Sequence, residues 1–371
     1  MNIGVLTETT FCERRVALTP ASVRRLAENG HRVHVEHGAG ARSHFPDSSY
    51  ALAGASIAFS AAEVIDRSEL LVKVERTTPA ESAQLHPRQT VMAFFHMALA
   101  ERAEIQQFLE KSITTIGYEI IETPDGRLPV LESISEIAGQ MSIAVAAHLL
   151  RSTSGGRGIL LGGAPGIPPA QVVILGAGVV GSWAARTAAA SGAVTLVLDN
   201  EVRKLRRLLA MAPGAVTGLA DAETVREAVR EADVLIGAVL LHGERTPHLV
   251  TRGMVEVMKR GAVIVDVSID QGGCVETSRP TTLADPVFVS NGVLHYCVPN
   301  MTADIAHAAS TALSQAALPY ILEIAAKGVK TALDERRDLA RGAYTAGGEC
   351  VNPALLLDQA RITGAKQVAA L

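Results

Sequence analysis

The stretch QVVILGAGVVG, residues 171–181, constrains the fold of this chain more than any other segment. An apolar run leads into a G-x-G-x-x-G pattern, and a helical pattern follows at once. Gly176 permits a tight turn, Gly178 lets the backbone approach a pyrophosphate, and Gly181 lets the helix pack closely on the strand. Strand, glycines and helix together predict a Rossmann-type βαβ unit that binds a dinucleotide.

Asp199 refines this prediction because it ends the next apolar run, VTLVLD. In dinucleotide-binding folds an acid at this position accepts hydrogen bonds from the ribose hydroxyls. Its charge repels a 2′-phosphate, so we expect NAD rather than NADP. The N-terminus of the helix after Gly178 adds unpaired N–H groups for the pyrophosphate.

Short β-rich runs alternate with helical patterns along most of the chain, which predicts parallel sheets built from βαβ units. The expected strands lie at 2–6, 32–36, 56–59, 70–74, 90–95 and 114–119, and then at 171–175, 194–199, 232–239, 262–268 and 293–299. The expected helices include 20–30, 100–112, 135–151 and 302–328, and the Gly-rich stretch 154–170 is expected to be a loop or linker.

A chain of 371 residues is long enough for two domains. We expect an α/β fold with two Rossmann-like domains, parallel sheets and an active-site cleft between the domains. The helix near 302–328 follows the nucleotide-binding series and is expected to return to the first domain. The predicted domains are a discontinuous substrate domain, residues 1–133 and 302–371, and an NAD-binding domain, residues 134–301.

Composition excludes several other classes of protein. The formal net charge is −4 and no long basic run appears, which argues against a nucleic-acid or membrane partner. Cys12, Cys274, Cys297 and Cys350 are scattered, so neither a disulfide framework nor a metal site is expected. The N-terminus lacks the pattern of a signal peptide. We therefore expect a cytoplasmic protein without a bound metal.

Further motifs carry a resemblance to a known family. They are IGVLTET with ERRVALTP (3–20), FFHMA (94–98), SEIAGQMS (135–142), GGRGILLGG (155–163), VILGAGVVG (173–181), IGAVL (236–240), VIVDVSIDQGGCVETSRPTT (263–282) and HYCVPNM (295–301). With them the chain resembles the alanine dehydrogenase family, which includes the nucleotide-binding part of proton-translocating transhydrogenases. The resemblance implies reversible NAD-linked oxidative deamination of L-alanine to pyruvate and ammonia. It also implies a homo-oligomer, typically a hexamer, with a dimer as the alternative.

The resemblance implies roles for individual residues. His96 corresponds to the family's acid/base, Asp270 to its second catalytic group, and Arg15 to the residue that binds the substrate carboxylate. Arg15, His96 and Tyr118 also follow three expected strands, whose carboxyl ends meet at one edge of a parallel sheet. We therefore expect Tyr118 to contact substrate as well.

These residue types suit the chemistry. An arginine offers a fixed fork to a carboxylate, and a histidine can transfer a proton near neutral pH. Asp270 can orient water or ammonia and stabilise a cationic iminium. Each residue also has an ordinary structural explanation, such as a solvated arginine or an aspartate that forms a turn beside Gly272.

The resemblance also supplies neighbours for the cofactor. They are Ser135, Val179, Lys204, Val239, Leu240, Ile269, Asp270, Arg279, Asn300 and Met301, in addition to Gly176, Gly178, Gly181 and Asp199. Lys204 either reaches the adenosine ribose or is an ordinary exposed lysine of the helix that follows Asp199.

The segment LVKVER, residues 71–76, departs from the family, whose usual form is KVKEP. Lys73 matches the first lysine, but Glu75 takes the place of the second, which binds substrate in the family. An ammonium at this position helps to hold a 2-oxo acid, whereas a carboxylate repels it.

Three interpretations of Glu75 follow, besides a solvated side chain in a shifted register. The site accepts a different amino acid, whose basic or amino-bearing group pairs with Glu75. Alternatively Lys73 or Arg76 replaces the missing cation, although strand alternation places 73 and 75 on one face and 76 on the other. Alternatively the protein is a catalytically silent NAD-binding protein with a regulatory or assembly role. We favour the altered substrate because the three expected functional residues Arg15, His96 and Asp270 remain.

Two further segments depart from the family. SIS at 133–135 replaces PMS, and NMTADIAHAAST at 300–311 replaces a stretch like NMPGAVPRTST, with His307 in its place. In the family the second segment borders the active site and the subunit contacts. Its change is a further reason to expect a substrate other than L-alanine. A transhydrogenase-like component is disfavoured because no membrane segment follows.

Overall fold

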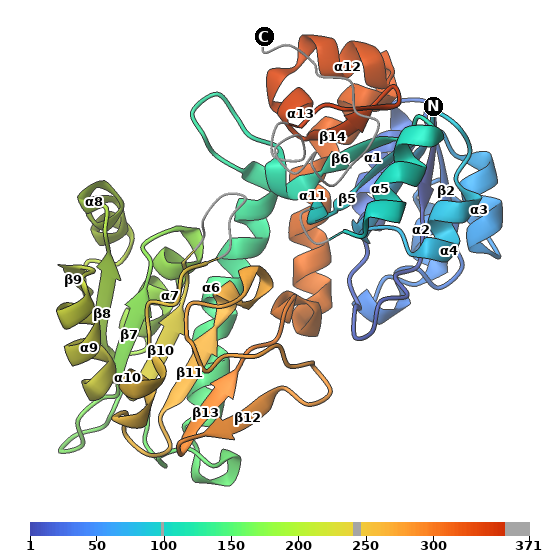
Figure 1. Ribbon diagram of the computed structural model, residues 1–371. Helices are drawn as coiled ribbons and strands as arrows, with labels where there is room; N and C mark the ends of the chain where they lie inside the picture. Colours follow the sequence, from blue (N-terminus) through green and yellow to red (C-terminus); the bar gives the residue numbers. More distant parts are fainter. Residues whose placement is uncertain (98–99, 240–245, 353–371) are drawn as a thin grey trace. The chain divides into compact units, whose positions relative to one another are not determined.

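The computed structural model describes residues 1–97, 100–239 and 246–352 (Figure 1). The chain divides into two compact units, the first formed by Met1–Ile134 with Ala303–Leu371 and the second by Ser135–Thr302. Each unit has its own mainly parallel sheet, so the predicted α/β class with two Rossmann-like domains is confirmed. Leu240, one of the expected cofactor neighbours, lies outside the described residues.

The first unit contains an eight-stranded sheet in the order β15-β14-β6-β5-β4-β1-β2-β3. Its strands are β1 (Asn2–Val5), β2 (Arg32–Glu36), β3 (Ser56–Ala58), β4 (Leu70–Glu75), β5 (Thr90–Phe94), β6 (Thr114–Gly117), β14 (Ala343–Ala346) and β15 (Glu349–Cys350). Strands β1 to β6 pair in parallel, whereas β14 runs antiparallel to both β6 and β15. The sequence analysis missed this edge. Gly347 and Gly348, both with positive φ, make the tight turn of its hairpin.

Helices cover both faces of this sheet. They are α1 (Pro20–Glu28), α2 (Asp47–Leu52), α3 (Ala61–Arg67), α4 (Pro79–Gln84), α5 (Arg102–Glu110), α11 (Ala306–Lys327), α12 (Val329–Glu335) and α13 (Arg337–Arg341). Side chains of α1 and α11 share a core with Val5 and Val72, whereas α3 and α5 share a core with Leu71 and Val91. Successive residues of a strand point to opposite faces of the sheet. The sheet of the first unit is therefore buried on both faces, with one core on each.

The long helix α11 also fixes the loop between β1 and α1. The Val16 amide donates to Ser310 Oγ at 2.9 Å, and the Thr19 amide donates to Ser314 Oγ at 3.0 Å. Both serines are buried on α11. A helix near the end of the chain thus positions the loop that carries Arg15.

The second unit contains a seven-stranded sheet in the order β12-β13-β11-β10-β7-β8-β9. Its strands are β7 (Gln171–Leu175), β8 (Val194–Asp199), β9 (Val216–Leu219), β10 (Val234–Gly237), β11 (Val263–Asp266), β12 (Val287–Ser290) and β13 (Val293–Tyr296), with β12 antiparallel to β13. The helices are α6 (Pro129–Leu149), which belongs to this unit from Ser135 onwards, α7 (Val179–Ala190), α8 (Val202–Met211), α9 (Ala222–Glu231) and α10 (Arg252–Glu256). One face packs on α6, α7 and α8, and the other on α9 and α10.

Two local expectations for the second unit need adjustment. Helix α6 begins at Pro129 rather than at 135, as suits a proline in the first helical turn. The Gly-rich stretch 154–170 is a loop of this unit that leads into β7, not a linker between the units. No helix in the described part of the chain is long and apolar enough to cross a membrane.

Candidate functional site

The turn between β7 and α7 has the geometry expected of a pyrophosphate site. Gly176 has φ 101°, and a Cβ there would lie 2.4 Å from the Ala238 carbonyl oxygen. A Cβ on Gly181 would lie only 1.9 Å from the Gly176 carbonyl oxygen. Gly178 precedes the first residue of α7, Val179, and faces open space. The glycines therefore bring helix and strand together and leave the N-terminus of α7 accessible.

Asp199 fixes this turn from the end of β8. Its buried carboxylate accepts the Ala177 amide at 2.7 Å and the Glu201 amide at 2.8 Å. A carboxylate has about four lone-pair sites, so acceptor capacity remains for ribose hydroxyls. Lys204 Nζ lies 2.6 Å from Glu201 Oε1, so this lysine has a partner within its own helical turn. The glycine turn and Asp199 together fit a dinucleotide.

The other expected cofactor neighbours have varied local contacts. Val239 donates its amide to Ser268 Oγ at 3.0 Å, and the guanidinium of Arg279 lies 4.4 Å above the ring of Phe288. Ile269 and Met301 are buried, Ser135 is half-buried on α6, and Asn300 has a positive φ of 48°. Their contact with cofactor stays a prediction.

Asp270 lies in a short 3-10 helix, Val267–Gln271, directly after β11. Asp266 anchors this helix, because its carboxylate accepts the amides of Ser268 at 3.2 Å and Cys274 at 3.1 Å. Burial raises the pKa of Asp266, although hydrogen bonds from the Ser278 side chain and from the Cys274 amide act in the opposite direction. The buried Asp266 thus ends β11, and Asp270 lies one helical turn later.

Arg15 is buried and binds two carboxylates. Its Nε donates to Glu13 Oε1 at 2.8 Å and its Nη2 to Glu13 Oε2 at 2.6 Å, while Nη2 also lies 3.1 Å from Glu75 Oε1. Burial lowers the pKa of Arg15, but Glu13 and Glu75 outweigh it, so the net shift is upward. Glu75 therefore faces the predicted carboxylate binder, at the position where the sequence resemblance predicts a cation in the family.

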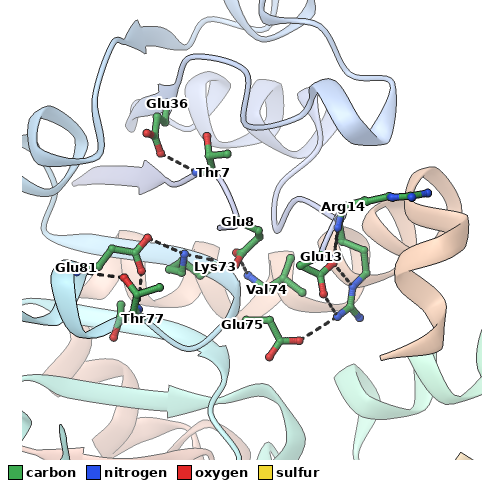
Figure 2. Close-up of polar contacts among 12 residues, drawn as sticks. Thr7, Glu8, Glu13, Arg14, Glu36, Lys73, Val74, Glu75, Thr77 and Glu81 are labelled. Atoms are coloured by element: carbon green, nitrogen blue, oxygen red, sulfur yellow. Dashed lines mark hydrogen bonds and ion pairs between the residues drawn. The ribbon is translucent and has the colours of Figure 1, made fainter. Parts of the chain in front are cut away.

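Lys73 is fully buried and does not replace that cation. Its Nζ lies 3.1 Å from Glu81 Oε1 and 3.4 Å from Glu8 Oε2, and Figure 2 shows it between these two acids. The other candidate cation, Arg76, lies with its Nη1 atom 3.9 Å from Glu104 Oε2. The pairing of β4 with β5 shifts its register between Val72 and Glu75.

Glu8 is a buried acid whose pKa is strongly raised. Its Oε1 accepts the Val74 amide at 2.6 Å. Burial raises its pKa to about 7, although Lys73 and this amide act in the opposite direction, and the nearby Glu75 and Glu13 add to the increase. Glu8 therefore exchanges a proton near neutral pH.

His96 follows β5 with an exposed side chain and a φ of 46°. Its amide donates to Glu119 Oε1 at 2.7 Å, and Tyr344 Oη donates to the same oxygen at 2.8 Å. A non-glycine residue in this conformation is strained, so it needs support from its surroundings. Glu119 supplies that support, and the sequence analysis missed it.

Tyr118 is fully buried beside Phe94, whose ring also stacks with His96. The Tyr118 hydroxyl has no hydrogen-bond partner among the described residues. Burial raises the pKa of Tyr118, and the Glu8 carboxylate adds to this increase. Tyr118 and His96 therefore flank one aromatic ring, and the tyrosine hydroxyl lies in the field of Glu8.

Sequence reasoning missed Glu8, Glu13 and Glu119. A weak signal exists for each: Glu8 and Glu13 lie in the same loop as Arg15, between β1 and α1, and Glu119 lies just beyond the end of β6, next to Tyr118. His307, singled out as a departure from the family, donates from Nδ1 to the Ser43 carbonyl at 2.8 Å.

Fold and site together define an α/β dinucleotide-binding protein whose other unit carries a buried arginine and an exposed histidine in the loops that follow β1 and β5. The sequence models of the alanine dehydrogenase/PNT N-terminal and C-terminal domains match residues 4–138 and 142–353. The alanine dehydrogenase of Mycobacterium tuberculosis (strain CDC 1551 / Oshkosh) is 43% identical over 359 residues, which is 96% of each chain. That of Halomonas elongata is 43% identical over 343 residues, 92% of each chain.

A solved structure of an L-alanine dehydrogenase superposes with a TM-score of 0.92 at 41% identity, and the match covers 97% of this chain and 99% of the other. The chain therefore belongs to the alanine dehydrogenase/PNT family, as its motifs suggested. It binds NAD and acts as an NAD-dependent amino-acid dehydrogenase.

Proposed function

We propose that this protein catalyses the reversible, NAD-linked oxidative deamination of an L-amino acid other than L-alanine, giving a 2-oxo acid and ammonia. The observation that carries the proposal is the ion pair of 3.1 Å between Arg15 Nη2 and Glu75 Oε1. A substrate carboxylate that binds Arg15 must compete with Glu75 and lie close to its charge. Like charges at such a separation repel in a poorly solvated site, which makes pyruvate a poor substrate.

NAD supplies the hydride acceptor for the α-carbon when it is bound. The glycine turn of β7–α7 would hold its pyrophosphate, and Asp199 would hold its ribose. Arg15 binds the substrate carboxylate and so fixes the α-carbon. His96 takes a proton from the amine or from the attacking water, and Asp270 orients water or ammonia and stabilises the cationic iminium. The support for these roles is the family relationship and the position of each residue after a strand.

The test is NADH oxidation with ammonia and a panel of 2-oxo acids that includes pyruvate. Wild type should turn over another 2-oxo acid better than pyruvate, and Glu75→Lys should shift the preference towards pyruvate. Glu69→Lys is the matched control. Glu69 is an exposed glutamate that directly precedes β4, and its carboxylate accepts a hydrogen bond from the Asn2 amide. Efficient use of pyruvate by wild type, together with a loss in Glu75→Lys, would show an ordinary alanine dehydrogenase.

The pairing of Arg15 with two carboxylates also favours a second candidate, a catalytically silent NAD-binding protein with a regulatory or assembly role. In that case Glu13 and Glu75 occupy the arginine permanently. Fluorescence titration should then show tight NADH binding, whereas no member of the 2-oxo acid panel should give turnover.

We also propose a homo-oligomer, a hexamer or a dimer, located in the cytoplasm. The family resemblance supports the assembly, and the scattered cysteines support the compartment. Size-exclusion chromatography with light scattering tests the oligomeric state directly.

A further inference from the structure

The backbone of His96 needs support from its surroundings. Strand β5 ends at Phe94, so the amides of Phe95 and His96 lie beyond the hydrogen-bond ladder of the sheet. His96 has φ 46°, in the left-handed region that residues other than glycine rarely adopt. Such a conformation persists only where neighbouring groups hold it. The side chain of His96 is exposed, so the support has to come mainly through the backbone.

Glu119 holds both amides. It lies in the short 3-10 helix Tyr118–Ile120, directly after β6, which is the parallel neighbour of β5. Its Oε1 accepts the His96 amide at 2.7 Å and the Phe95 amide at 3.2 Å, and its Oε2 lies 3.4 Å from the Phe95 nitrogen. Hydrogen bonds from amides to a carboxylate are charge-assisted and stronger than those between neutral groups. One carboxylate therefore fixes the two residues with which the chain leaves the sheet.

Tyr344 fixes the Glu119 carboxylate in turn. Its buried hydroxyl donates to Glu119 Oε1 at 2.8 Å, and its ring meets the Phe95 ring edge-on at 6.3 Å between centroids. Burial raises the pKa of Tyr344, and the charge of Glu119 adds to the increase, so the hydroxyl keeps its proton and remains a donor. The same tyrosine thus contacts the acid and the residue before His96.

The register of β14 brings Tyr344 to this place. Strand β14 runs antiparallel to β6 in the first unit (Figure 1). The register shifts at Tyr344, which is an extra residue between two successive pairs, Ala343 with Ile116 and Thr345 with Thr115. An inserted residue of this kind changes the direction of a side chain, and such bulges are frequent next to active sites.

Gly117 makes the close approach of Tyr344 possible. A Cβ on Gly117 would lie 2.4 Å from Tyr344 Cε2 and 3.0 Å from Glu119 Oε2. The backbone of Gly117 has an ordinary φ of −86°, so the missing side chain, not the backbone conformation, explains the glycine. Its amide donates to the Gly342 carbonyl at 2.8 Å, next to the start of β14. Two independent features, an inserted residue and a missing side chain, thus bring the Tyr344 hydroxyl to Glu119.

We propose that Tyr344 is a positioning residue for His96 and acts through Glu119. Its hydroxyl fixes the orientation in which Glu119 Oε1 faces the His96 amide, and this contact maintains the left-handed backbone that sets the direction of the imidazole. The proposal rests on the proposed function, because it takes His96 as the residue that transfers a proton. A strand near the end of the chain thereby completes the support of a residue that lies far earlier in the sequence.

Tyr344→Phe tests the proposal because it removes only the hydroxyl and keeps the ring. With ammonia and the most active 2-oxo acid of the panel, kcat should fall roughly tenfold, about as much as in Glu119→Gln, because a displaced acid/base transfers its proton less efficiently. The KM for NADH should stay within about twofold of wild type. The double variant should lose no more than the more affected single variant, since the two residues act as a unit.

Thr345→Val is the matched control. Its hydroxyl bonds to the Thr115 hydroxyl at 2.8 Å and donates to the Ile113 carbonyl at 2.8 Å. The substitution removes a buried hydroxyl from the same strand without a change to Glu119. It should therefore lower the melting temperature but leave kcat within about twofold of wild type. In a His96→Ala background, Tyr344→Phe should leave the residual rate unchanged, because its effect passes through His96.

Three results would overturn the proposal. The first is a Tyr344→Phe variant with the kcat of wild type. The second is an equal loss of activity in Thr345→Val, which would indicate a general role of the strand in stability. The third is a double variant in which the losses of Tyr344→Phe and Glu119→Gln multiply, which would show that the two residues act independently.

Amide hydrogen exchange separates this proposal from the proposed function. An absence of turnover with every 2-oxo acid would reject the dehydrogenase proposal, but exchange needs no turnover. Mass spectrometry of peptides that contain Phe95 and His96 should show exchange roughly tenfold faster in Tyr344→Phe than in wild type, and no change in Thr345→Val. Equal exchange in Tyr344→Phe and wild type rejects the positioning role, and good turnover alongside it keeps the dehydrogenase function.

Discussion

Replacing Glu8 by glutamine should change how the stability of this protein depends on pH. Burial raises the pKa of Glu8 from 4.5 to about 7, so the folded state holds the proton more tightly than the unfolded state. Such a group leaves the protein most stable below pH 4.5, and this stability is lost as the pH rises towards 7. This rise in the pKa of Glu8 from its ordinary 4.5 to about 7, at 1.36 kcal/mol for each pH unit, corresponds to about 3 kcal/mol.

Glutamine resembles the protonated carboxyl and does not titrate. Near pH 4 the variant should therefore have nearly the free energy of unfolding of wild type, and at pH 8 it should be more stable by up to about 3 kcal/mol. Chemical denaturation followed by circular dichroism, at several pH values on both proteins, measures this difference. Glu69→Gln is the control, because this side chain is exposed at the start of β4. A difference that stays constant between pH 4 and 8, or that favours wild type at high pH, would refute the reasoning.

Three further substitutions test other parts of the site. Gly181→Ala places a Cβ 1.9 Å from the Gly176 carbonyl oxygen, so NADH affinity measured by fluorescence titration should fall at least tenfold, roughly 1.4 kcal/mol; an unchanged affinity would contradict the packing argument. Asp199→Asn removes the charge that excludes a 2′-phosphate, so the affinity ratio of NADH to NADPH should fall roughly tenfold, and a constant ratio would reject its role. Glu119→Gln weakens the support of the His96 backbone, so kcat should fall roughly tenfold while NADH affinity stays constant; full activity would show that this support is unnecessary.

Much of the fold was predictable because its strongest signals are local. The strands β1, β2, β4 and β5 coincide closely with the apolar runs of the first third, and β7, β8 and α7 follow from the glycine motif. The antiparallel strands β12 and β14 were missed. β14 is short and pairs with the distant β6, which a local pattern does not reveal. β12 pairs with β13, the next strand along the chain, across Asn291-Gly292, so here the sequence analysis overlooked a local hairpin signal.

The site was predictable to a smaller extent. The family match and the strand ends drew attention to Arg15, Glu75 and His96, and the structure adds that Glu75 contacts Arg15 directly. Glu8 and Glu119 act through contacts with residues far away in the sequence, Lys73 and Tyr344. No spacing rule predicts such contacts, because they depend on how strands and loops meet in three dimensions.

The serine contacts between α11 and the loop of Arg15 have a consequence for synthesis on the ribosome. Val16 and Ser310 are separated by 294 positions, and the second unit, Ser135–Thr302, lies between them in the chain. The second unit is continuous in sequence and can fold as soon as it has emerged, whereas the loop of Arg15 must wait for α11. Maturation therefore runs against the order of the sequence: the glycine turn that holds the nucleotide forms first, and the arginine near the start of the chain reaches its final position last.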